Sequence, residues 1–158
     1  MTIEDFKTLM DEFDPASLLP ELDTVIGKIA FLARIAVLVG PIVLLVLGLL
    51  YFFAAPKEAN YYVGYRCYFG MGSVEAWRFT QRLAGMVLGA LGLVLSIVML
   101  LVSGGFAKME TMDLLWRAIS CVLWEAGLTA VACLAVNTLV ALQFDAKGDH
   151  RKKSTQKA

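Results

Sequence analysis

The segment that decides the fold is IAVLVGPIVLLVLGLLYFFAA, residues 35–55, which has 21 residues and no charged side chain. Residues 83–103 (LAGMVLGALGLVLSIVMLLVS) also carry no charge, and residues 118–142 (AISCVLWEAGLTAVACLAVNTLVAL) carry only Glu125. As helices these segments would each be about 30 Å or more in length, which matches the hydrocarbon core of a bilayer. The sequence therefore predicts an all-α integral membrane protein, with three transmembrane helices in a small bundle.

The overall composition agrees with this class. Hydrophobic residues make up 59% and charged residues 18% of the 158 residues, whereas soluble domains are about 45–50% apolar and about 25% charged. Such a composition excludes a disordered chain and argues against a secreted disulfide scaffold. The 14 basic and 14 acidic residues balance, and no feature of the chain predicts a nucleic-acid partner.

No catalytic or metal site is expected. Cys121 and Cys133 are 12 residues apart in one predicted helix, so about 18 Å separates them, which is beyond the reach of a disulfide. Cys67 lies in a loop, and the only histidine, His150, lies in a polar tail. No nucleophile–base motif or metal-ligand spacing is present. We therefore expect neither enzymatic activity nor a cofactor.

The distribution of basic residues predicts the orientation in the membrane. With three spans, the loop at 56–82 and the tail at 143–158 lie on one side and carry nine of the 14 basic residues, against five on the other side. The positive-inside rule then places the loop and the C-terminus in the cytoplasm and the N-terminus outside.

The two ends of the chain differ in character. Residues 1–34 predict an acidic amphipathic helical arm, in which Ile3, Phe6, Met10 and Phe13 share one face. The arm is either a docking or gating element for a partner or, as we prefer, a helix folded onto the bundle or the membrane surface. A second helix is expected to start near Ser17 and to run into the first span. Residues 143–158 predict a basic, flexible tail.

The loop at 56–82 is rich in tyrosine and glycine, and its end predicts a helix start. Ser73 is a plausible N-cap, and Glu75 falls in the first turn, where the helix dipole favours an acid. From Val74 the helical pattern runs directly into the second span. Glu75, Arg78 and Arg82 then share one face, and the opposite face holds Trp77, Gln81 and Ala84.

These residues resemble the SdpI-type membrane proteins. That family shows Asn-x-x-x-Gly-x-Arg-Thr-Pro, then Ser-x-Glu-x-Trp at a helix start, and Arg-x-x-Gly leading into the membrane. In this chain the resemblance covers roughly residues 60–85, with Cys67-Tyr68 in place of Thr-Pro. The positions that match the family are Asn60, Gly64, Arg66, Ser73, Glu75, Trp77, Arg82 and Gly85, and Arg78 lies among them.

The resemblance implies a role in toxin immunity and signalling at the bacterial cytoplasmic membrane. Its type member protects against a sporulation-delaying toxin and holds a transcriptional repressor at the membrane, so a toxin peptide or a regulatory protein is the implied partner. A second interpretation stays open, in which Arg66 and Arg82 bind lipid phosphates or helix carbonyl ends and Trp77 sets the depth of the helix.

The second span carries a stripe of small residues, Gly85, Gly89, Gly92 and Ser96. Small residues at this spacing let two helix backbones approach closely. The stripe predicts either packing within the three-helix unit, which we prefer, or the seam of a homodimer.

The third span contains two polar residues, Glu125 and Asn137. An ionisable group at this depth is costly and suggests a function. The alternative for Glu125 is a structural role as a neutral carboxyl that forms a hydrogen bond inside the bundle. Three classes of function remain: an SdpI-type immunity or signalling protein, a small subunit or scaffold of a larger transport-related assembly, and an intramembrane enzyme, which we place last.

Overall fold

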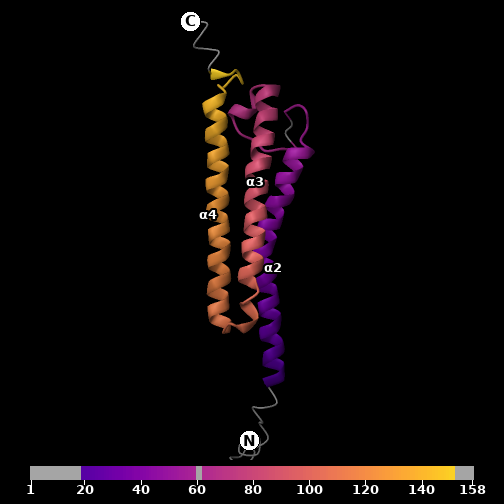
Figure 1. Ribbon diagram of the computed structural model, residues 1–158, viewed down its shortest axis with the longest axis vertical. Helices are drawn as coiled ribbons and strands as arrows, with labels where there is room; N and C mark the ends of the chain where they lie inside the picture. Colours follow the sequence, from indigo (N-terminus) through magenta and orange to yellow (C-terminus); the bar gives the residue numbers. More distant parts are fainter. Residues whose placement is uncertain (1–18, 60–61, 152–158) are drawn as a thin grey trace, which may run out of the picture.

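The computed structural model describes residues 19–59 and 62–151, with side chains from residue 24 onward. Its three long helices are α2 (Leu19–Phe53), α3 (Val74–Ser103) and α4 (Thr111–Gln143), and the 3₁₀ helices η2 (Phe69–Met71) and η3 (Phe106–Lys108) lie in the two connections (Figure 1). The helices alternate in direction, so the connection before α3 and the segment after α4 lie at one end of the bundle. All three are long and apolar enough to cross a membrane, which confirms the predicted class.

Each helix begins before the apolar segment that predicted it. The candidate spans are Thr24–Phe53, Val74–Lys108 and Thr111–Gln143, against the predicted 35–55, 83–103 and 118–142. The second part of the predicted N-terminal arm, from Leu19, is the beginning of α2, which continues into the span without a break. The arm's predicted amphipathic face at residues 3–13 lies outside the described residues.

The most extensive helix contact joins α2 and α3, whose backbones meet at glycines. A Cβ atom on Gly85 would lie 2.7 Å from the backbone nitrogen of Phe52 in α2. A Cβ atom on Gly92 would collide with the α2 backbone at Leu44 and Leu45. On α2, Gly48 faces Gly85 and Gly89. Ser96, the last residue of the predicted stripe, donates a hydrogen bond to the Gly92 carbonyl at 2.7 Å. In this structure the stripe therefore packs within one chain.

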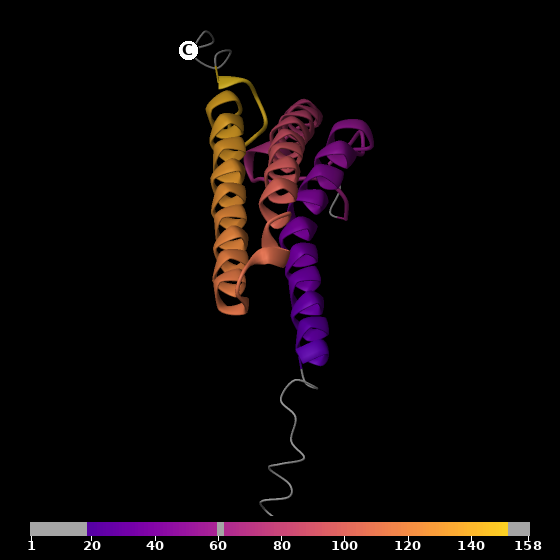
Figure 2. The ribbon, with the colours of Figure 1, turned by 60° about the horizontal axis from the view of Figure 1, so that its bottom comes forward.

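Helix α4 lies to one side of the pair formed by α2 and α3 in both views (Figures 1 and 2). Two apolar clusters hold it there, one near η3 and one at the opposite end. The first includes Ala30, Val37, Leu95, Met99, Phe106, Leu114 and Ala118, and the second is built from Ala76, Ala84, Val136, Val140 and Phe144. Large apolar side chains on the outer faces of the helices remain exposed, which suits contact with lipid rather than water.

Candidate binding site at the loop end

The described part of the loop end of the bundle consists of residues 54–59 and 62–73, the first turns of α3 and residues 144–151 (Figure 1). The helix start is the predicted one: Ser73 is the N-cap of α3, and its Oγ accepts a hydrogen bond from the Ala76 N–H at 3.1 Å. Most residues of the family pattern lie at this end, and Asn60 lies outside the described residues.

Gln81 ties the loop to α3. Its side-chain amide donates to the carbonyl of Tyr65 at 2.7 Å and accepts from the backbone N–H of Tyr65 at 2.8 Å. Gln81 is buried, and a buried polar group that loses its partner costs about 1–3 kcal/mol. The pair therefore fixes the position of the loop over the helix.

Trp77 makes a second connection one turn earlier. Its ring is completely buried, and its Nε1–H donates to the carbonyl of Pro56 at 2.8 Å. The ring also lies against Gly64, which has φ +122°, and a Cβ atom on Gly64 would be 2.7 Å from the ring atom Cη2. Glycine is required here both for its backbone conformation and for the space.

Tyr65 extends the same network to α4. Its hydroxyl lies 3.0 Å from Oδ1 of Asn137 and 3.2 Å from the carbonyl oxygen of Cys133, and it donates to these two acceptors. Its ring stands edge-on to that of Tyr51, with 6.3 Å between the centroids. Burial raises the pKa of the Tyr65 phenol, so the hydroxyl keeps the proton that it donates. Asn137, a polar residue of the third span, therefore forms its hydrogen bond with the loop end and not with Glu125.

At the departure Cys67-Tyr68, the backbone has a torsion that proline also allows. Tyr68 has φ −54°, within the range that a proline ring imposes. The Sγ of Cys67 lies 4.0 Å from Oγ1 of Thr80, and both contact Gly70, where a Cβ atom has no room.

The segment after α4 folds back onto the start of α3. The Ser73 hydroxyl donates to the carbonyl of Gly148 at 2.8 Å, and Glu75 Oε1 lies 3.1 Å from His150 Nε2. The ring of His150 packs on that of buried Phe144 at 4.5 Å. Residues 144–151 of the predicted flexible tail are thus a folded part of this end, because Phe144 supplies an apolar anchor and Gly148, with φ +80°, a tight turn.

That turn is stabilised by Asp145. Its Oδ1 accepts hydrogen bonds from the backbone N–H groups of Lys147 and Asp149, each at 2.9 Å. These donors, that of Asp149 first, lower the pKa of the Asp145 carboxyl, so it stays ionised in the turn.

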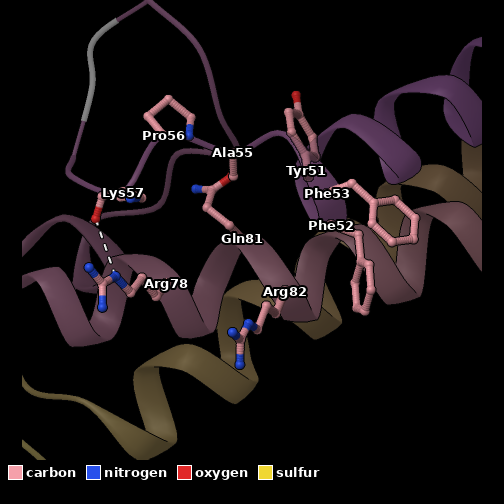
Figure 3. A pocket seen from close by; sticks show the side chains of 9 residues that line it. All are labelled: Tyr51, Phe52, Phe53, Ala55, Pro56, Lys57, Arg78, Gln81 and Arg82. Carbon is pink, nitrogen blue, oxygen red and sulfur yellow. Dashed lines mark hydrogen bonds between the residues drawn. The ribbon is translucent and has the colours of Figure 1, made fainter.

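A pocket of about 440 Å³ opens beside this network (Figure 3). Its charged lining consists of Lys57 from the loop and Arg78 and Arg82 from α3, and Phe52 and Phe53 at the end of α2 line the apolar side. The Nε–H of Arg78 donates to the carbonyl of Lys57 at 3.4 Å. Three cationic groups beside aromatic rings can attract and hold an anion. Arg66 is exposed and does not line this pocket.

Glu125 lies apart from the loop end, near the middle of α4. It is only 5% exposed, and its Oε1 has no hydrogen-bond partner among the described residues. Its Oε2 approaches Gly40 of α2, where a Cβ atom would be 2.8 Å away. The neighbouring Pro41 has no N–H, so the carbonyl of Val37 lacks its usual helical donor.

Sequence reasoning missed Tyr65, Gln81 and Lys57 as parts of this site. Gln81 carried a usable signal, because a polar amide on the same face as Trp77 and Ala84 had to find a buried partner. Tyr65 is one of several tyrosines in this loop, and no local pattern distinguishes it from the others.

Three helices long and apolar enough to span a membrane, a polar loop end and a pocket lined by three basic side chains define an integral membrane protein with a candidate binding site at one end of its bundle. The chain belongs to the SdpI/YfhL protein family, whose model matches residues 57–142. That range includes the loop from Lys57 onward, α3 and nearly all of α4, but neither the end of α2 nor residues 144–151. Among curated proteins and among solved structures, none matches the chain significantly.

Proposed function

We propose that the protein acts in the bacterial cytoplasmic membrane as an SdpI-type immunity or signalling protein, which binds a toxin peptide or a regulatory protein and catalyses no reaction. The observation that carries this proposal is the family match over residues 57–142, combined with the folding of its polar motif into one end of the bundle.

The motif residues divide into two groups that suit such a role. Trp77, Gly64 and Ser73 are engaged in contacts that hold the loop end together. Arg66 and Arg82 are exposed at the same end, where a partner can reach them. A rigid base with exposed cationic groups is a plausible recognition surface for a partner at the membrane.

The orientation with the loop end in the cytoplasm and the N-terminus outside is part of this proposal. Glu58 and Ala107 are both exposed, and they lie at opposite ends of the bundle. In a Cys67→Ser background, Glu58→Cys should be protected from a membrane-impermeant thiol reagent in intact cells, and Ala107→Cys should be labelled. The reverse pattern would show the opposite orientation.

The function is tested by toxin challenge. The chain is expressed in a bacterium that is sensitive to the sporulation-delaying toxin and lacks its own immunity protein. We expect more cells to survive than with the empty vector. Survival should also exceed that of cells with an unrelated three-span protein at the same level in the membrane. Survival no better than with that unrelated protein would remove the immunity role for this toxin.

The alternative is a small subunit or scaffold of a larger, transport-related membrane assembly. Buried Glu125, whose Oε1 has no hydrogen-bond partner in the described part of the chain, favours this alternative, because an ionisable group inside the bundle is costly unless it is used. Extraction in a mild detergent should then yield partner subunits in fixed stoichiometry. Under the main proposal the chain is purified without them when toxin and repressor are absent.

A further inference from the structure

The cationic pocket at the loop end lies next to an apolar groove. This groove, of about 290 Å³, runs between residues 45–53 of α2 and 85–93 of α3 and shares Phe52 and Phe53 with the pocket. Gly48, Gly85 and Gly89 line it where the backbones of α2 and α3 meet. A polar, cationic cavity is thus adjacent to an apolar one.

We propose that the two cavities together bind one anionic phospholipid, with its phosphate between Lys57, Arg78 and Arg82 and an acyl chain in the groove over the glycines. This goes beyond the proposed immunity role, since it assigns a lipid site to the protein whether or not a toxin or a repressor is its partner.

Charge is the first argument for this ligand. The pocket lining has three basic side chains and no acidic one. Within the described part of the chain, no carboxylate forms an ion pair with any of the three. The side chains are therefore free of internal neutralisation, and a phosphate provides the acceptor oxygens that guanidinium groups prefer.

Depth is the second argument. Phe53 ends α2, so the pocket lies where the apolar part of the first span ends and the polar loop begins. In a bilayer this is the level of the lipid headgroups, where aromatic and basic side chains gather. Basic pockets between transmembrane helices at this level bind anionic headgroups. The groove below it lies at the level of the acyl chains.

The shape of the groove argues against a second copy of the chain as the occupant. The glycines that would let another helix approach are already used by the contact of α2 with α3. What remains open is an apolar groove beside a cationic cavity, and this pair suits an amphipathic molecule with one charged head.

The headgroup part is tested by native mass spectrometry of the purified protein in a neutral detergent. Dioleoyl phosphatidylglycerol and dioleoyl phosphatidylcholine, which have the same chains, are added separately at equal concentration. We expect more bound phosphatidylglycerol, and we expect Arg82→Gln, alone and combined with Arg78→Gln, to lower it to the phosphatidylcholine level. The control Arg117→Gln, an exposed arginine on α4 near η3, should leave binding unchanged. Equal binding of both lipids by the wild type, or equal loss in the control, would overturn the proposal.

The acyl-chain part is tested with Ala90→Phe, which places a ring in the groove from an exposed position. Binding of phosphatidylglycerol should fall while the melting temperature is kept, and Ala130→Phe, on an exposed part of α4, should have no effect. Inorganic phosphate is the last probe. If it displaces phosphatidylglycerol at equal concentration and Ala90→Phe is silent, the pocket is a site for free anions and the lipid assignment is wrong. No toxin is needed, so the result is independent of the proposed function.

Discussion

The loop end and the middle of the bundle are held together by different forces. At the loop end, side chains far apart in sequence form hydrogen bonds, as Gln81 does with Tyr65 and Ser73 with Gly148. In the middle, the backbones of α2 and α3 touch at glycines, and Glu125 is buried with one oxygen that forms no hydrogen bond to any residue that the structure describes. The difference shows that polar residues near a membrane surface can be structural, whereas one in its interior requires another explanation.

The largest effect on stability is expected from Gly92→Leu, which disrupts the contact between α2 and α3 in the middle of the bundle. Its side chain would collide with the backbone of α2, which cannot move aside as a flexible side chain can. We expect a loss of about 3 kcal/mol or more in the free energy of unfolding, measured by thermal unfolding in detergent. Gly127→Leu is the control, because a Cβ atom at Gly127 meets nothing within 4 Å. Equal stability of the two variants would mean that the glycines do not hold α2 and α3 together.

Gln81→Leu should have the next largest effect on stability, because it removes the hydrogen bonds that hold the loop on α3. The substitution places an apolar side chain of similar size in the helix and leaves the part-buried N–H and carbonyl of Tyr65 without their partner Gln81. A loss of about 2 kcal/mol is expected. Gln143→Leu, at an exposed position at the end of α4, should change little, and a similar loss in this control would contradict the interpretation.

Tyr65→Phe should have a smaller effect, since it removes only the hydroxyl that reaches α4. We expect a loss of about 1 kcal/mol, with Tyr68→Phe as the exposed control. The neutral phenol is the donor, and burial raises its pKa in the folded state. The stabilisation is therefore complete below the ordinary tyrosine pKa of about 10 and falls as the pH rises towards the folded value. A difference between wild type and Tyr65→Phe that grows with pH would refute this assignment.

The smallest effect on stability is expected from Glu125→Gln. Glutamine has nearly the same shape, and Oε1 has no hydrogen bond to lose, so the change should stay below about 1 kcal/mol. If Glu125 is used as an ionisable group, toxin protection or any other activity should disappear while the melting temperature is kept. A fully active Glu125→Gln variant would show that the charge has no function.

The three helices and the start of α3 could be predicted from sequence, because they depend on local patterns: apolar length, and the cap Ser73 followed by Glu75. The faces of the α3 start were also predictable, with Trp77 and Gln81 buried and Arg78 and Arg82 exposed. These features depend on spacing of only a few residues.

The connections between distant segments were not predictable in the same way. The hydroxyl of Tyr65 meets Asn137, 72 residues later, and no property of either residue selects the other. The fold of residues 144–151 depends on Phe144 finding an apolar site beside Phe79, which exists only after α3 and α4 have packed. For the same reason, the small-residue stripe could not by itself reveal that Gly48 faces it.

The central claim is that the loop end is where the protein binds its partner. The most direct test compares Arg66→Gln with Lys108→Gln in the toxin-survival assay. These two basic residues are exposed at opposite ends of the bundle. Both variants are compared at equal membrane expression and with unchanged melting temperatures. We expect Arg66→Gln to reduce survival towards that of cells without the protein, and Lys108→Gln to protect as the wild type does. Full protection by Arg66→Gln together with loss in Lys108→Gln would place the binding site at the other end and contradict the claim.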